Sequence, residues 1–74
     1  MAVVRKLEQL TLEKDSPHTE VECTYSIMNE KEERFLQIDT YGSTTRKIPG
    51  KKSQSIRFAP EAIKQLKIIL EQDF

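Results

Sequence analysis

The clearest chemical signal in the sequence is a basic stretch that contains no acid. Residues 41–57 hold five Lys and Arg side chains and no Asp or Glu, whereas residues 1–40 hold five basic and nine acidic side chains. The five cations are Arg46, Lys47, Lys51, Lys52 and Arg57. Lys and Arg neutralise phosphate groups, and nearby hydroxyls such as those of Ser43 and Ser55 hydrogen-bond to them. Because the formal net charge is zero, the chain is not uniformly basic, and its positive charge is concentrated in one segment.

Three aromatic residues lie in or beside the predicted strands around this segment. Tyr41 stands directly before the basic stretch, and Tyr25 and Phe35 fall in two adjacent predicted strands. An aromatic ring gives an unstacked base a surface to stack on. We therefore predict that these three rings and the five cations form a nucleic-acid-binding surface. The alternative is a long exposed loop that is lysine-rich for solubility, and residue types alone do not decide between the two.

The sequence offers no catalytic or metal-binding constellation. His18 and Cys23 are the only histidine and the only cysteine, and a zinc site needs about four ligands. No serine or cysteine pattern places a nucleophile against His18. The acids of residues 30–33 alternate with Lys31 and Arg34, as in a solvated turn. We expect no enzymatic activity, no cofactor and no metal.

Length and composition indicate one small domain over residues 1–74. A chain of 74 residues with one cysteine has no intramolecular disulfide to stabilise it, and small domains often compensate by oligomerisation. We therefore expect a homodimer. No apolar run approaches the roughly 20 residues of a membrane span, and an unpaired cysteine without an export signal indicates the cytoplasm.

Apolar and polar residues alternate in the middle of the chain, as in strands with one buried face. The first such stretch is 19–28, where Val21, Cys23, Tyr25 and Ile27 share one side. The next is 34–41, and the short polar link 29–33 predicts an antiparallel hairpin. A short final strand is expected over 53–58.

The remaining segments are less regular. Residues 1–18 form either a first strand that ends near Lys14 or a flexible N-terminal arm; we favour the strand, although Val3, Val4, Leu7 and Leu10 also fit helical spacing. Pro49-Gly50 predicts a type II turn inside the long connection 42–52.

A helix is predicted from Pro60, because proline suits the first helical position. Its apolar stripe consists of Ala62, Ile63, Leu66, Ile69 and Leu70. Ile68 lies on the opposite face between Lys64 and Gln72, and these three residues are the candidate dimer interface; the alternative is an isolated exposed isoleucine without a partner. The expected fold is α+β, with three or four antiparallel strands in a curved sheet followed by one helix.

The order of these parts resembles the single-stranded-DNA-binding domain of the positive cofactor four transcriptional coactivator family and its small bacterial relatives. The resemblance covers roughly residues 23–70. It is carried by three stretches: 35–41 (FLQIDTY), 48–52 (IPGKK), and 55–66, which includes Ser55-Ile56-Arg57-Phe58, Pro60-Glu61 and Leu66. Two features depart from the family pattern, namely the extra residues Ser53 and Gln54 and the absence of tryptophan. Some of the same residues are also similar to short, uncharacterised bacterial proteins.

The resemblance implies a homodimer that pairs through its helices and binds single strands across its sheet. It would place Tyr41 at the strand-end aromatic position and Lys51 and Lys52 among the basic residues after the Pro-Gly turn. The expected partner is therefore single-stranded DNA or RNA. The alternative is a small protein-interaction or accessory domain that uses a strand edge or the back of the helix.

Overall fold

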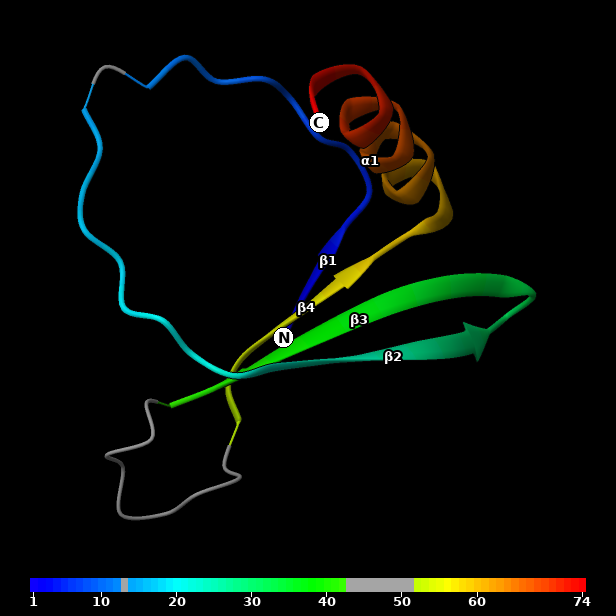
Figure 1. Ribbon diagram of the computed structural model, residues 1–74. Coiled ribbons are helices and arrows are strands. Elements are labelled where there is room, and N and C mark those ends of the chain that lie inside the picture. Colours follow the sequence, from blue (N-terminus) through cyan, green and yellow to red (C-terminus); the bar gives the residue numbers. More distant parts are fainter. Residues whose placement is uncertain (13, 43–51) are drawn as a thin grey trace.

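The computed structural model describes residues 1–12, 14–42 and 52–74 and consists of one sheet and one helix (Figure 1). The strands are β1 (Ala2–Val4), β2 (Cys23–Glu30), β3 (Glu33–Tyr41) and β4 (Lys52–Phe58), and the helix is α1 (Pro60–Asp73). The strands lie in the order β1-β4-β3-β2. The predicted α+β class is confirmed. The sheet is mostly antiparallel, but β1 runs parallel to β4.

The hairpin between β2 and β3 turns more tightly than expected. Its strands pair without interruption from Cys23 opposite Thr40 to Glu30 opposite Glu33. Only Lys31 and Glu32 remain for the turn, and both have positive φ angles, 49° and 65°. Two left-handed residues in succession match the twist of a two-residue hairpin. Neither residue is glycine or asparagine, so this turn carries backbone strain.

The expected first strand is present but much shorter than predicted. It spans Ala2–Val4, and the described residues between 5 and 14 have no strand geometry. Directly after β1, Arg5 pairs with carboxylates on two other elements, Glu33 of β3 at 3.2 Å and Glu61 of α1 at 3.3 Å. The described residues of 5–22, here called the N-terminal arm, contain no regular secondary structure.

One helix side chain holds the start of this arm. The Gln65 side chain accepts a hydrogen bond from the Leu7 backbone N–H at 2.8 Å and donates one to the Leu7 carbonyl at 3.1 Å. Leu7 is the only described residue of the arm that is half-buried, and the others are exposed. The arm is therefore fixed to α1 at Leu7, and Figure 1 shows that it then swings away from the sheet before it reaches β2.

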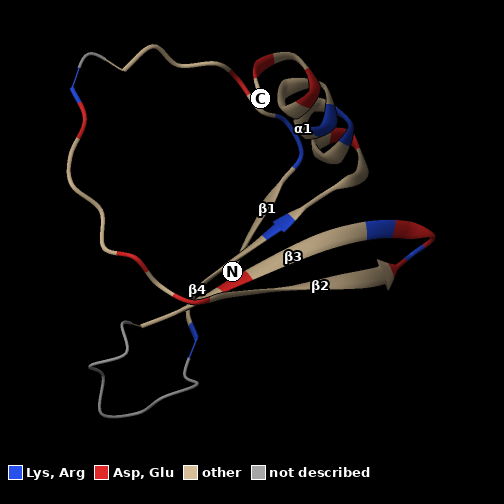
Figure 2. Ribbon diagram, viewed as in Figure 1, with Lys and Arg blue, Asp and Glu red and all other residues tan. Residues whose placement is uncertain are grey.

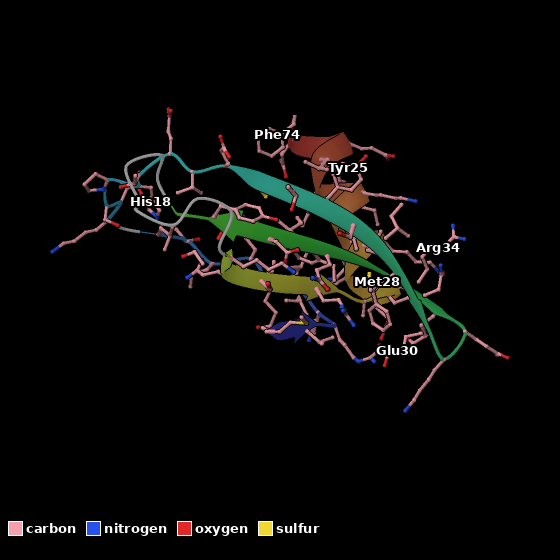
Figure 3. All side chains as sticks on the ribbon, turned by 90° about the horizontal axis from the view of Figure 1, so that it is seen from below. His18, Tyr25, Met28, Glu30, Arg34 and Phe74 are labelled. Atoms are coloured by element: carbon pink, nitrogen blue, oxygen red, sulfur yellow. The ribbon has the colours of Figure 1, made fainter. Side chains whose placement is uncertain are left out.

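The alternation of β3 gives the sheet two different faces. On the face that we call the apolar face, Ile38 lies opposite Tyr25 and Ile56, and Leu36 lies opposite Ile27 and Phe58. On the other, the polar face, Gln37 lies between Ser26 and Arg57, and Asp39 between Thr24 and Ser55. Figure 3 shows α1 on the same side as Tyr25, with Met28 and Glu30 on the opposite side. The helix therefore packs on the apolar face.

The helix begins at Pro60, as predicted, and only its first half packs on the sheet. Ala62 is buried, and Ile63 and Leu66 are half-buried. The predicted stripe continues to Ile69 and Leu70, yet these side chains are 38% and 50% exposed. The second half of α1 therefore extends beyond the sheet.

The hydrophobic core of the single chain is thin. Its buried apolar residues are Phe35, Ala59 and Ala62, and no large side chain of the described residues is fully buried. The radius of gyration is 14.6 Å, whereas about 11 Å is expected for a compact domain of this length. The chain alone thus leaves much of its apolar surface uncovered.

Replacing the strained turn should stabilise the hairpin. The double substitution Lys31→Asn and Glu32→Gly supplies residues that adopt positive φ readily, so we expect the free energy of unfolding to rise by about 1 kcal/mol. Urea denaturation measures it. The control Lys31→Asn alone should give a smaller gain, and a double variant that is less stable than the parent contradicts the turn geometry.

Candidate nucleic-acid interface

A hydrogen-bonded network occupies the centre of the polar face. Asp39 is only 3% exposed. Its carboxylate accepts hydrogen bonds from Ser55 Oγ at 2.6 Å and from Gln37 Nε2 at 3.1 Å, and Lys52 Nζ lies 3.4 Å from it. A buried carboxylate is stable only when donors or cations surround it. Three side chains from β3 and β4 meet this requirement.

Arg57 extends the network along β4. Its guanidinium donates to Gln37 Oε1 at 3.1 Å and 2.6 Å, and to Glu30 Oε2 at 3.2 Å. The guanidinium carbon lies 5.8 Å from the centre of the Phe35 ring. Because these contacts fix the planar guanidinium group, it has one orientation before any ligand arrives.

The network changes the acidity of Asp39. The hydrogen bond from Ser55 is the largest cause that lowers the pKa of Asp39 below its ordinary value of 3.8, and Gln37 and Lys52 act in the same direction. Desolvation opposes them by favouring the neutral acid. The carboxylate is therefore negatively charged at neutral pH and keeps Lys52 at the polar face.

Tyr41 and Lys52 flank the connection between β3 and β4. They are register partners across the two strands, next to an irregularity at Thr40 and Tyr41. The Tyr41 hydroxyl lies 3.0 Å from Thr24 Oγ1, which holds the ring over β2. The Lys52 side chain is 55% exposed. An aromatic ring and a cation are thus adjacent where β3 ends and β4 begins.

The structure brings some of the predicted binding residues together and separates others. Tyr41, Lys52 and Arg57 lie on the polar face, and Phe35 lies there as well but is only 6% exposed, under Arg57. Tyr25 lies on the apolar face with 74% of its surface exposed. The expectation that Tyr25 and Phe35 share one stacking surface is therefore wrong, because the alternation of paired strands points them in opposite directions.

Three further predictions lie outside the described residues. Arg46, Lys47 and Lys51 belong to residues 43–51, as does the turn expected at Pro49-Gly50. Figure 2 shows the charged residues of the described part, with basic positions in β4, where the sequence has Lys52 and Arg57.

Sequence reasoning misses the central role of Gln37 and Asp39. Strand alternation correctly places both on the side opposite Leu36 and Ile38, but it predicts that they face solvent. The signal that could have revealed this network is the presence of two polar residues at alternate positions of a strand that has neighbours on both sides. Side chains of both neighbouring strands flank such residues; here Gln37 and Asp39 are only 5% and 3% exposed, so their polar groups need partners.

Other kinds of site find no support in the described part of the chain. Residues 1–12, 14–42 and 52–74 contain no group of three or more His, Cys, Asp or Glu side chains arranged to hold a metal ion. Over the same residues, no helix has the length and apolar character needed to cross a membrane. No protein-family model matches the chain, and no curated protein or solved structure is significantly similar to it.

The acidity of Asp39 gives a test of the network. Because the folded-state pKa is lowered, the stability that this carboxylate contributes is complete above its ordinary value of 3.8 and is lost as the pH falls through the lowered pKa. Ser55→Ala removes the largest cause, so the pKa of Asp39 should rise towards its ordinary value. Carboxyl-carbon NMR titration measures the change. Ser53→Ala, at an exposed position of the same strand, is the control, and equal titration curves for the two variants would contradict the network.

Proposed function

We propose that this chain is a non-enzymatic, single-stranded nucleic-acid-binding module whose ligand lies along the polar face. The proposal rests on one observation, the adjacent pair of Tyr41 and Lys52 within the acid-free basic stretch of residues 41–57. The resemblance to the positive cofactor four family supports the same assignment. The ligand class is single-stranded DNA or RNA.

The polar face supplies the groups that such a ligand needs. Lys52 is available to pair with phosphate, and Arg57 stands further along β4. Arg46, Lys47 and Lys51 of the basic stretch are further candidate phosphate partners by residue type. The hydroxyls of Thr24 and Ser26 lie on the same face and can hydrogen-bond to sugar, phosphate or base edges. The Tyr41 ring offers a stacking surface that tolerates any base.

The carboxylates on this face set the strength of binding. Lys52 is paired with Asp39, and Arg57 with Glu30. The Lys52 and Glu30 side chains are more than half exposed, whereas their partners Asp39 and Arg57 are only 4% and 16% exposed. A phosphate that displaces Glu30 releases an exposed carboxylate, but a phosphate that draws Lys52 away removes one partner from a buried carboxylate, which costs free energy. Binding through exchange of partners should be moderate in affinity and sensitive to salt.

The proposed module is a homodimer that pairs through the back of α1. Ile68 is 53% exposed on the back of α1, between the exposed residues Lys64 and Gln72. When two copies of α1 pair in antiparallel orientation about Ile68, Lys64 of one copy lies near Glu71 of the other. The opposite charges attract, and the arrangement satisfies two-fold symmetry.

A protein-interaction function is the second candidate, and the open apolar face favours it. Tyr25 and Ile27 of β2 are 74% and 60% exposed. An open depression on the same face includes Ala2, Ile38 and Ile56 in its lining. An exposed apolar surface of this kind is typical of a protein-binding site. Co-purification of one defined protein, without oligonucleotide binding, would select this candidate.

Fluorescence anisotropy with labelled oligonucleotides at several salt concentrations tests nucleic-acid binding. The variant Lys51→Ala/Lys52→Ala should bind all single-stranded sequences more weakly. Each lost phosphate contact reduces the slope of log K against log salt by about 0.7, so two contacts remove about 1.4. The control Lys67→Ala removes one exposed cation from α1, away from the polar face, and should leave the slope unchanged. Binding that is absent, or that does not respond to salt, rules out the proposed function.

Analytical ultracentrifugation tests the helix interface. We expect the unmodified chain to sediment as a dimer at tens of micromolar, and Ile68→Lys to raise the dimer dissociation constant, because the substitution places a charge at the centre of the helix pair. Lys67→Glu is a control for altered charge elsewhere on α1. A strictly monomeric parent chain at this concentration removes this interface.

A further inference from the structure

The N-terminal arm contains a strand-like segment without a strand partner. Leu10 and Leu12 alternate with Gln9 and Thr11, and the two leucines are 76% and 70% exposed. Among the described residues, no backbone–backbone hydrogen bond joins residues 8–21 of the arm to another element. The arm is nevertheless held at both ends, at Leu7 by Gln65 and at Glu22, whose carbonyl accepts a hydrogen bond from the Tyr41 N–H at 3.0 Å.

β2 presents the opposite situation, a free edge without a strand. It is the terminal strand of the sheet on this side, and it pairs only with β3. Residues 23–28 contain no charge and no proline, and their pairing with β3 has no bulge. Natural edge strands usually carry one of these features, because unpaired N–H and C=O groups recruit another strand.

The two segments match each other residue by residue. When the arm lies antiparallel to β2 with Thr11 opposite Ser26, Leu10 faces Ile27 and Leu12 faces Tyr25. All four apolar side chains then lie on the apolar face, and the two hydroxyls lie on the polar face. In the same register Lys14 lies opposite Cys23, next to the acid Glu22.

The arm of the same chain is badly placed for this pairing. It leaves β1, whereas β2 is the opposite edge of the sheet, three strand spacings or roughly 14 Å away. In this structure the arm is also held on α1 at Leu7 by Gln65, and its described residues 8–21 make no backbone hydrogen bond to β2.

Pairing of β2 with the β2 of another copy in the register centred on Ser26 is also disfavoured. An antiparallel arrangement centred on Ser26 puts Glu22 directly opposite Glu30 at both ends, and like charges directly opposite each other destabilise a strand pair. The arm has no acid between Gln9 and Leu12, so the arm of a second copy is the better partner for this edge.

We propose that two copies of this chain exchange their N-terminal arms, with residues 9–12 of each copy forming a fifth strand on the β2 edge of the other. The exchange is reciprocal and therefore closes as a two-fold dimer. It pairs both sets of open backbone groups and covers Tyr25 and Ile27. This inference is independent of nucleic-acid binding, because the polar-face residues Lys52 and Arg57 take no part in it.

Substitutions in the arm test the exchange by sedimentation of the full chain. Leu10→Lys and Leu12→Lys each replace a side chain that is exposed in the single chain, so the protomer should keep its fold. Each should raise the dimer dissociation constant roughly tenfold or more, the value of one buried leucine. The control Thr19→Lys adds the same charge to the arm outside the paired segment and should leave the dissociation constant unchanged.

Disulfide trapping tests the register and the identity of the partner. Opposite residues of an antiparallel pair have Cα atoms about 4.5–5.5 Å apart, which a disulfide can span. Lys14→Cys should therefore form a disulfide with the native Cys23 of the other copy and give a covalent dimer on a non-reducing gel. The variant Lys14→Cys/Cys23→Ser should lose that band.

Three results would overturn the proposal. The first is a parent chain that is monomeric, and the second is a dimer that the lysine substitutions leave intact, as expected if α1 alone forms the interface. The third is a disulfide within one chain of the Lys14→Cys variant, between the introduced thiol and Cys23, which would show that the arm pairs with its own β2. Oligonucleotide titration of Leu12→Lys distinguishes a failure of arm exchange from a failure of nucleic-acid binding. Because the polar face is unchanged in this variant, each chain should still bind oligonucleotide even where the dimer dissociates.

Discussion

The structure depends on the pairing of β3 on both of its edges. A strand with neighbours on each side sends alternate side chains to two faces, and side chains of both neighbouring strands flank them there. In β3, Leu36 and Ile38 meet the apolar residues of β2 and β4 on the face that carries the helix, while Gln37 and Asp39 meet Ser55 and Arg57 on the other. A slip of one residue would place Asp39 on the apolar face without donors. The register of this strand therefore determines both the hydrophobic packing and the polar network.

The two faces differ in the kind of order that they provide. The polar network is complete within the chain, since no buried side-chain nitrogen or oxygen of the described residues lacks a hydrogen-bond partner. The apolar face is incomplete, because the helix covers only part of it and Tyr25 and Ile27 remain exposed. A preformed polar surface suits the recognition of a polar ligand, and an uncovered apolar surface suits association between chains. The proposals for binding and for self-association thus use different sides of one sheet.

The fold was largely predictable from the sequence, since the alternation in 23–41 and the Pro60 signal at the start of α1 follow directly from local preferences. The short β1 was not, because it is defined by parallel pairing with β4, whose residues lie more than 25 positions away in the sequence. Among the candidate site residues, the positions of Tyr41 and Arg57 follow from strand alternation. Lys52 lies outside the predicted strand 53–58, and it reaches Asp39 on the polar face beside the register irregularity at Thr40 and Tyr41, which alternation does not predict. The burial of Phe35 under Arg57 and the inward position of Asp39 depend on which strands flank β3, and local sequence does not contain the order of strands.

The contact between Gln65 and Leu7 has a consequence for how the two positions tolerate change. The side-chain amide of Gln65 pairs with the N–H and the C=O of Leu7 in the way that a neighbouring strand would. The helix therefore recognises the backbone at position 7 rather than its side chain, and any residue except proline supplies the same two groups. Position 65 is far more restricted: asparagine is one methylene shorter, and ionised glutamate has no hydrogen to donate. Across natural variants, the residue at position 7 should vary widely while that at position 65 stays glutamine.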